Sequence, residues 1–335
     1  MSPMIDLLLL FIPFFALVLL GWVAARRGVV PIDGIGSLNS FVLYFGLSAM
    51  VFRLSASGSL MQEGLLGLLL AYGLAGSVVT ALALIWAVRA GLVRRDGGLV
   101  ALVTAFPNTG FLGLPLLTGL LGPQAAGPVA ATLIVDVLLL SSLCLAWAHS
   151  HAAQDAPGDD PQEVWHAVQA SLKGALRNPL LWSMAVGMAF AALHWHLPKP
   201  VDETVRLLGL SATPTALFTL GAILARAQMQ PLHVEVAMPG IQVPAVLKLA
   251  VHPMLVCALG WGLHRAGVTL TDAGLLTVTM AAALPSASNV SMLAEREGAN
   301  TTLVARVILW TTACALVTAA LWAHLLGVQA ALATT

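Results

Sequence analysis

Long uninterrupted apolar stretches limit what this chain can fold into. One near the N-terminus, LLLLFIPFFALVLLGWVAA, contains no charged residue. A helix that spans a bilayer needs about 20 mainly apolar residues, and it must satisfy its own backbone hydrogen bonds where no water is present. The 335-residue chain is 59% hydrophobic and only 9% charged, whereas soluble domains carry about 25% charged residues. The sequence therefore predicts an all-α integral membrane protein.

Apolar stretches of this kind follow one another along the whole chain. The ten predicted membrane helices are 5–25, 34–53, 64–88, 97–121, 126–148, 179–196, 204–225, 242–264, 271–295 and 301–325. One long polar stretch separates the first five from the last five. We therefore expect a first unit at 1–148, a linker at 149–178 and a second unit at 179–335. Arg26 and Arg27 follow the first apolar stretch, whereas a signal peptide carries its positive charges in front, so we expect this stretch to remain as a helix.

The positions of lysine and arginine predict the orientation, because cytoplasmic loops retain these residues. One set of alternate loops holds Arg26, Arg27, Arg89, Arg94, Arg95, Lys173, Arg177, Arg226 and Arg296, and the other holds Arg53, Lys199, Arg206 and Arg265. This bias of nine against four predicts that both termini lie outside the cytoplasm and that the 149–178 linker lies inside it. The formal net charge is zero and no basic tract occurs, so nothing indicates a nucleic-acid partner.

The two halves carry matching residues in the same order. The matches are Pro13 and Gly21 with Pro179 and Gly187, SAMVF at 48–52 with PTALF at 214–218, RAG at 89–91 with RAG at 265–267, Pro107 with Pro285, and VDVLLLSSLC at 135–144 with ARVILWTTAC at 305–314. A duplicated half with an odd number of helices must insert upside down, an arrangement that is common in secondary transporters. We therefore predict two inverted five-helix repeats.

The spacing between matched residues divides the helices into two groups. Matches in the first two helices of each half lie 166 residues apart, whereas those in the last three lie 170 to 178 apart. The sequence therefore predicts a panel of four helices, at 5–25, 34–53, 179–196 and 204–225, and a core made of the other six.

Two predicted helices carry a proline and then short polar residues in the middle of apolar sequence. These residues are Pro107, Asn108 and Thr109 in FPNTG, and Pro285, Ser286, Ser288 and Asn289 in LPSASN. Proline removes a backbone hydrogen bond and clashes with the preceding turn, so both helices should break there. In a membrane the freed backbone groups cost several kcal/mol each unless protein or a water-lined cavity satisfies them, which predicts a binding site.

The polar residues after each proline can cap the second half-helix, whose free N–H groups and positive dipole end suit an anion. The alternative is that both prolines merely kink their helices and that the polar residues satisfy the local backbone. Two prolines at equivalent places in inverted copies favour a crossover site.

These two segments, with RNPLLWSMAVG at 177–187 and TPTALFTLGAILA at 213–225, resemble bacterial members of the auxin efflux carrier family over essentially the whole chain. The resemblance implies a bacterial inner membrane protein with ten helices in two inverted repeats, a scaffold and a mobile transport core. It implies that helices 97–121 and 271–295 cross at their prolines, and that two copies dimerise through the scaffold.

The resemblance also implies a function. Members of this family export or exchange small carboxylates, so the expected substrate is a small organic anion. Carried over to this sequence, the residue that contacts the substrate is Asn108, and Ser286 stands where a second Asn is expected. The contacts of the two repeats with a carboxylate are therefore not expected to be symmetric.

Ionisable residues inside membrane helices are energetically expensive and are candidates for function. Asp136 and Arg306 occupy equivalent positions in the two halves, which favours an ion pair within the core. Lys248 and His252 share a helix face at i, i+4 spacing, where the lysine can meet a substrate or extend to the membrane interface. The sequence leaves open whether a proton or a sodium ion is coupled to transport.

Other function classes lack the residues that they need. His194 and His196 flank Trp195 at a helix end without a third ligand nearby, which favours an interfacial aromatic belt over a metal site. We expect no cofactor, because no HExxH, GxSxG, CxxC or Walker motif occurs. The alternatives to a carrier are therefore a channel, a transporter-like sensor or, with less support, an intramembrane enzyme.

Overall fold

Helical segments occur in each of the ten predicted ranges. The computed structural model describes residues 3–58, 63–149, 179–229 and 240–328, so most of the predicted linker lies outside the described residues. The helical elements are α1 (Pro3–Arg26), α2 (Gly34–Phe41), η1 (Val42–Leu47), α3 (Ser48–Ala56), α4 (Leu65–Arg89), α5 (Arg94–Ala105), η2 (Thr109–Gly113), α6 (Leu114–Leu121), η3 (Pro123–Ala125), α7 (Ala126–Ile134), η4 (Val135–Leu140), α8 (Ser141–His149), α10 (Pro179–Ala192), α11 (Lys199–Met229), α12 (Gln242–Val246), η5 (Leu247–Val251), α13 (His252–Arg265), α14 (Asp272–Ala282), α15 (Asn289–Arg296) and α16 (Thr301–Leu325).

Many of these elements have the length and composition of membrane helices. Within the described ranges, six continuous helices are long and apolar enough to cross a membrane. They are Gly34–Ala56, Leu65–Arg89, Pro123–His149, Lys199–Met229, Gln242–Arg265 and Thr301–Leu325. Shorter apolar helices lie at Phe11–Arg26, Thr109–Leu121, Pro179–Ala192 and Asp272–Ala282. The prediction of an all-helical membrane protein is therefore confirmed.

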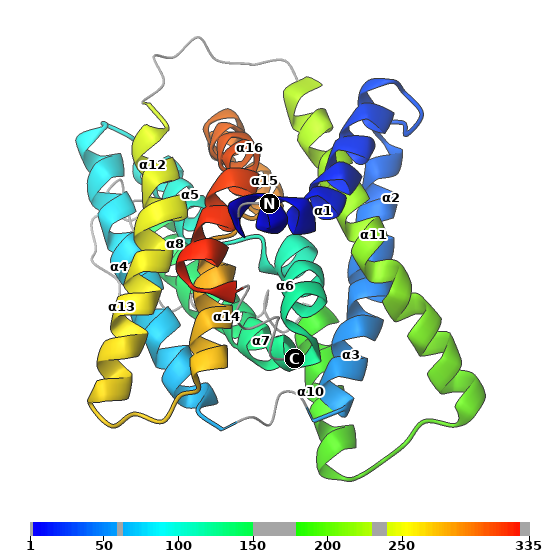
Figure 1. Cartoon of the computed structure of the whole chain (residues 1–335). Coiled ribbons are helices and arrows are strands. Elements are labelled where there is room, and N and C mark those ends of the chain that lie inside the picture. The colour runs from blue at the N-terminus through cyan, green and yellow to red at the C-terminus, as the bar shows by residue number, and fades with distance from the viewer. Residues whose placement is uncertain (1–2, 59–62, 150–178, 230–239, 329–335) are drawn as a thin grey trace.

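One group of helices packs along the side of the molecule that is on the right in Figure 1. It consists of α1, α2 with η1 and α3, α10 and α11, and we call it the scaffold. Helix α1 lies along α11, and α10 lies along α3. A Cβ atom on Gly21 would lie 1.9 Å from the carbonyl oxygen of Phe218, and one on Gly221 would lie 1.8 Å from that of Val18. Only glycine permits this approach of the α1 and α11 backbones.

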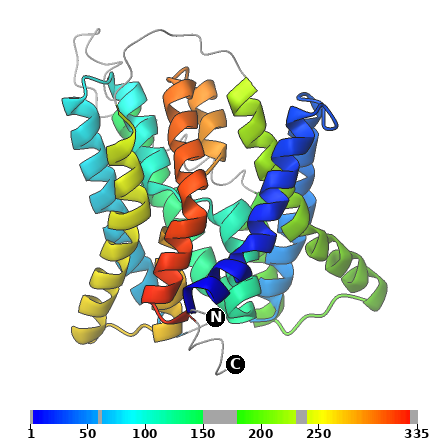
Figure 2. The same cartoon turned by 45° about the horizontal axis from the view of Figure 1, so that its top comes forward.

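The remaining elements, α4 to α8 and α12 to α16, form a second group that we call the core (Figure 1). Helix α4 packs against α5 and α13, and α16 packs against α5 and α15. The start of α1 and the end of α16 lie at the same end of the molecule (Figure 2). Both chain ends of the described structure therefore emerge on one side.

Two elements of the core are interrupted where proline was predicted to break them. Helix α5 ends at Ala105, and helical structure resumes at Thr109. Helix α14 ends at Ala282, and α15 begins at Asn289. Residue Phe106 is extended, with φ −86° and ψ 108°, as the steric restriction before a proline requires. The predicted breaks near Pro107 and Pro285 are therefore confirmed.

Candidate ligand site at the helix crossover

The two interruptions meet inside the core. The backbone N–H of Asn108 donates to the carbonyl oxygen of Pro285 at 2.8 Å, and that of Ala287 donates to Phe106 O at 3.0 Å. These bonds form an isolated antiparallel bridge between Pro107 and Ser286. The freed backbone groups of each break are thus partly satisfied by the other break, as burial demands.

Several polar side-chain atoms at this crossover find no partner among the described residues. They are Nδ2 of Asn108, Oγ of Ser286 and Oγ of Ser288. Each of these residues is at most 2% exposed. A buried polar atom left without a hydrogen bond costs about 1–3 kcal/mol. Three such atoms around one crossing point make it the candidate site for a polar ligand.

The predicted capping of the half-helices is wrong. Neither Asn108, which precedes η2, nor Ser288, which precedes α15, makes a side-chain cap bond. A capping residue normally has extended backbone, whereas Asn108 has φ −77° and ψ 57° and Ser288 is already helical. Asn289 is exposed as the first residue of α15. The side chains of Asn108 and Ser288 therefore do not satisfy the helix ends and are available to a ligand.

Beside the crossover lies a fully buried carboxylate, that of Asp136 in η4. The hydroxyl of Tyr72 donates to its Oδ1 at 2.9 Å. The hydroxyl of Thr109, one residue beyond Asn108, lies 3.5 Å from its Oδ2. The positive charge of Lys248 also lies close enough to attract this carboxylate. Thr109 therefore links Asp136 directly to the first break.

A fully buried ammonium group lies at the second break. Nζ of Lys248 donates to the carbonyl oxygen of Ala282 at 2.9 Å, where α14 ends. A cation is favoured at a helix C-terminus. Nζ also lies 3.3 Å from Nδ1 of His252, whose Nε2 has no partner among the described residues. The side chain of Lys248 is 0% exposed, so it points into the core and does not extend to an interface.

The predicted ion pair with Arg306 is not among the described contacts of Asp136. The partners of Asp136 are Tyr72 and Thr109, and Lys248 is the cation that attracts it. Arg306 lies on α16, is partly exposed and is not among the groups that contact Asp136. Matched positions in the two halves of a sequence need not touch each other in the fold.

Tyr72 was missed by the sequence reasoning, although a signal for it exists. It stands 176 residues before Lys248, which is the spacing that relates RAG at 89–91 to RAG at 265–267. Both side chains are fully buried beside the crossover. Asp136 and Lys248 each lie in a π-helical segment, a local irregularity that is frequent at functional sites.

The described residues contain no group of three or more His, Cys, Asp or Glu side chains that could hold a metal ion. The polar atoms at the crossover are amide, hydroxyl, carboxylate, ammonium and imidazole groups, a set that suits a small charged organic ligand.

A family model described as membrane transport protein matches residues 7–323. The chain belongs to this family, which is the auxin efflux carrier family. The resemblance stated from the sequence is therefore confirmed.

Individual relatives agree with this assignment. The chain is 28% identical over 307 residues, 90% of each protein, to "Putative malonate transporter" of Rhizobium meliloti. It is 24% identical over 314 residues to "Uncharacterized transporter" of Methanothermobacter thermautotrophicus, covering 92% of this chain and 95% of the relative. It is also 21% identical over 258 residues to "Auxin efflux carrier component 8" of Arabidopsis thaliana, covering 64% of this chain and 70% of the relative. The family and these names indicate a membrane transporter and not an enzyme.

Proposed function

We propose that this protein is a secondary transporter that carries a small carboxylate through the crossover of the two broken helices. The observation that carries the proposal is the set of buried atoms without partners, Asn108 Nδ2, Ser286 Oγ and Ser288 Oγ. An amide N–H and hydroxyl O–H groups donate hydrogen bonds to a carboxylate, and charge-assisted bonds of this kind are stronger than neutral ones. Lys248 adds a positive charge beside the second break.

The names of the relatives suggest which substrate to test first. The name of the Rhizobium meliloti relative includes malonate, so malonate is the first carboxylate to test. Ser286 provides a shorter polar group than Asn108 at the equivalent place in the second repeat. We therefore propose an asymmetric site in which Asn108 makes the principal contact.

The packing of the scaffold supports two inverted repeats. In the first contact, Gly21 of α1 meets the backbone of α11 at Phe218, where an added Cβ would lie 1.9 Å from the carbonyl oxygen. In the second, Gly187 of α10 meets the backbone of α3 at Phe52, where an added Cβ would lie 2.6 Å from the carbonyl oxygen. Gly187 stands 166 residues after Gly21, and Phe218 stands 166 residues after Phe52. The same close contact thus recurs at the spacing that relates the first helices of the two halves.

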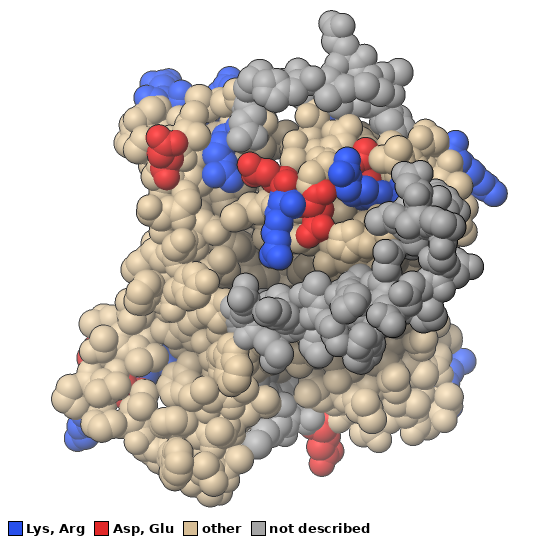
Figure 3. Space-filling model, turned by 180° about the vertical axis from the view of Figure 1, so that it is seen from behind, with Lys and Arg blue, Asp and Glu red and all other residues tan. Residues whose placement is uncertain are grey.

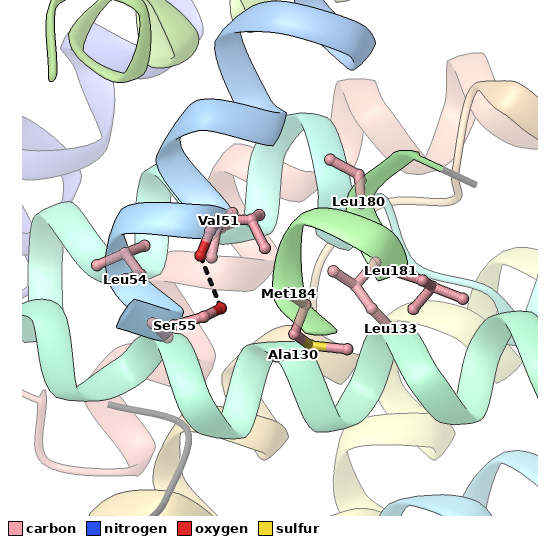
Figure 4. Close-up of a pocket in the computed structure, with 10 residues that line it drawn as sticks. Val51, Leu54, Ser55, Ala130, Leu133, Leu180, Leu181 and Met184 are labelled. Atoms are coloured by element: carbon pink, nitrogen blue, oxygen red, sulfur yellow. Dashed lines mark hydrogen bonds between the residues drawn. The ribbon is translucent and has the colours of Figure 1, made fainter. Parts of the chain in front are cut away.

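The boundary between scaffold and core suits movement of the core. A small apolar cavity of about 20 Å³ lies there, between α3 and α10 of the scaffold and α6 and α7 of the core (Figure 4). Its walls include Val51, Leu54, Leu133, Leu181 and Met184. Aliphatic surfaces can slide without breaking hydrogen bonds. We propose that the core carries its ligand across the membrane against a fixed scaffold.

Charge on the surface supports the orientation given above. In Figure 3 most of the lysine and arginine side chains gather at the upper end of the molecule. This end carries the helix termini at Arg26, Arg89, Arg94, Arg226 and Arg296. We propose that it faces the cytoplasm of a bacterial cell and that both chain termini lie on the opposite side of the inner membrane.

We also propose a homodimer through the scaffold. Large apolar side chains of this group are exposed, among them Leu19 and Leu20 of α1, Tyr44 and Phe45 of η1 and Leu210 of α11. Lipid covers such residues in a monomer, and a second copy can cover part of them.

Malonate binding by the purified protein tests the proposed site. Asn108→Ala removes one hydrogen bond to a charged group, worth about 1.5–3 kcal/mol, so affinity should fall roughly ten- to a hundredfold. Asn108→Asp keeps the shape but sets a negative charge against the anion, so it should weaken binding further. Calorimetry on variants with wild-type helix content measures both losses. Wild-type malonate affinity in a folded Asn108→Asp protein would remove the carboxylate from this site.

A further inference from the structure

We propose that anion binding at the crossover is coupled to protonation of Asp136, with Thr109 as the residue that links the two events. The proposal rests on the proposed function and deepens it, because it names a proton as the ion carried with the anion. The side chain of Asp136 is fully buried. In the described structure its hydrogen-bond partners are Tyr72 and Thr109, and of these two only Thr109 belongs to the segment that carries Asn108.

The hydrogen bonds of Thr109 allow two arrangements. Its hydroxyl lies 3.5 Å from Oδ2 of Asp136 and 3.4 Å from the carbonyl oxygen of Pro107. When Asp136 is ionised, this hydroxyl donates to Oδ2. When Oδ2 takes a proton from solvent, the new O–H donates to Oγ1 of Thr109, whose own proton then turns to Pro107 O. The protonation state of Asp136 therefore alters a hydrogen bond at the proline beside Asn108.

Charge balance supplies the reason for coupling. In the proposed empty state the Asp136 carboxylate balances the Lys248 ammonium, and both side chains are fully buried. An anion at the crossover adds a negative charge in a medium where unbalanced charge is expensive. If Asp136 then takes a proton, Lys248 balances the added charge. Protonation of Asp136 thus keeps the buried site neutral when a carboxylate with one negative charge binds, and it offsets one of the two charges of fully ionised malonate.

The groups that face Asp136 fit this role. Tyr72 on α4 donates a hydrogen bond to Oδ1, so the proton goes to Oδ2. The hydroxyl of Thr109 on η2 lies 3.5 Å from Oδ2, a distance at which a hydrogen bond is weak. Lys248 on η5 supplies the positive charge, and His252 on α13 faces the ammonium and not the carboxylate. The neighbours of Asp136 can therefore accommodate both of its charge states.

Calorimetry of malonate binding tests the proposal without a transport assay. The observed heat of binding is measured at about pH 8, where malonate is fully ionised, in buffers of different ionisation enthalpy. The slope of this heat against the ionisation enthalpy of the buffer gives the number of protons taken up per malonate bound. We expect about one proton per malonate in the wild type. By linkage, malonate affinity should then fall about tenfold for each unit of rising pH.

Matched variants assign the proton to one residue. Asp136→Asn cannot take the proton, so it should bind malonate with no proton uptake and with affinity independent of pH. Asp96→Asn is the control, because Asp96 is a core carboxylate that bonds to the backbone N–H of Asn300, away from the crossover. It should retain wild-type uptake. Thr109→Val should reduce proton uptake, and Thr109→Ser, which restores the hydroxyl, should recover it.

Each outcome decides the proposal. Malonate binding by the wild type without proton uptake would overturn it, as would unchanged uptake in Asp136→Asn. If Asp136→Asn does not fold, equal uptake in Thr109→Val and Thr109→Ser would overturn the link through Thr109. Failure of the folded wild type to bind malonate would overturn the proposed function, and the proton coupling with it.

Discussion

Replacement of Lys248 by methionine should destabilise the folded protein strongly. Methionine keeps the length of the side chain but removes the ammonium that donates to Ala282 O at 2.9 Å. A buried carbonyl without its partner costs about 1–3 kcal/mol. The Asp136 carboxylate also loses its attracting charge, worth about 2–3 kcal/mol for charges several ångströms apart at an effective dielectric constant of about 20. Together these two losses amount to about 3–6 kcal/mol.

A double-mutant cycle isolates the electrostatic part of this loss. Each single variant loses the attraction between Lys248 and Asp136, so the sum of the two single effects counts this loss twice. The double variant Lys248→Met/Asp136→Asn loses the attraction only once. The double variant should therefore be more stable than the sum of the single effects by about 2–3 kcal/mol. Lys199→Met is the control, since Lys199 is exposed at the start of α11 and should change stability by no more than about 0.5 kcal/mol.

Reversible unfolding in mixed detergent micelles, followed by circular dichroism, measures these free energies. An additive cycle, in which the double variant loses as much as the two single variants together, would refute the electrostatic pairing of Lys248 with Asp136.

Three further predictions concern packing, the second break and topology. Gly221→Ala places a Cβ 1.8 Å from Val18 O and should destabilise the scaffold by more than about 2 kcal/mol in the same unfolding assay, whereas Gly262→Ala, with nothing within 4 Å, should be neutral or stabilising. Ser286→Ala should lower malonate affinity by about 0.5–1.5 kcal/mol and Asn289→Ala by less, as calorimetry will show. Single cysteines in the 149–178 linker should be protected from impermeant reagents added outside cells, and a cysteine at Thr335 should not.

The sequence predicted the helices and their interruptions because both depend on local chemistry. The length of an apolar stretch determines whether a helix can span a membrane. The rings of Pro107 and Pro285 remove a backbone hydrogen bond and favour a break at their own positions, although Pro13 and Pro214 lie inside continuous helices. Errors at helix ends were modest: α10 stops at Ala192 instead of 196, and α11 starts at Lys199 instead of 204.

The partners of individual side chains could not be predicted in the same way. The side chain of Asp136 meets Tyr72 and Thr109 because α4 packs against η4 and η2 packs against α7, the helix that continues into η4. The direction of this side chain depends on the π-helical register of η4. Capping by Asn108 failed because its backbone angles follow from the pairing with Pro285. These outcomes depend on how distant segments approach each other, which local sequence does not specify.

Counterflow of malonate in proteoliposomes tests the central claim most directly. Vesicles that hold the protein and are loaded with unlabelled malonate are diluted into a trace of radiolabelled malonate. If the protein is a carrier with one site at the crossover, vesicles loaded with malonate should take up label faster than vesicles loaded with buffer and should transiently accumulate more of it. Asn108→Asp should abolish this excess. Uptake that is indifferent to malonate on the far side would indicate a channel. No malonate-dependent uptake, with a folded protein in sealed vesicles, would contradict the assignment of a carboxylate carrier.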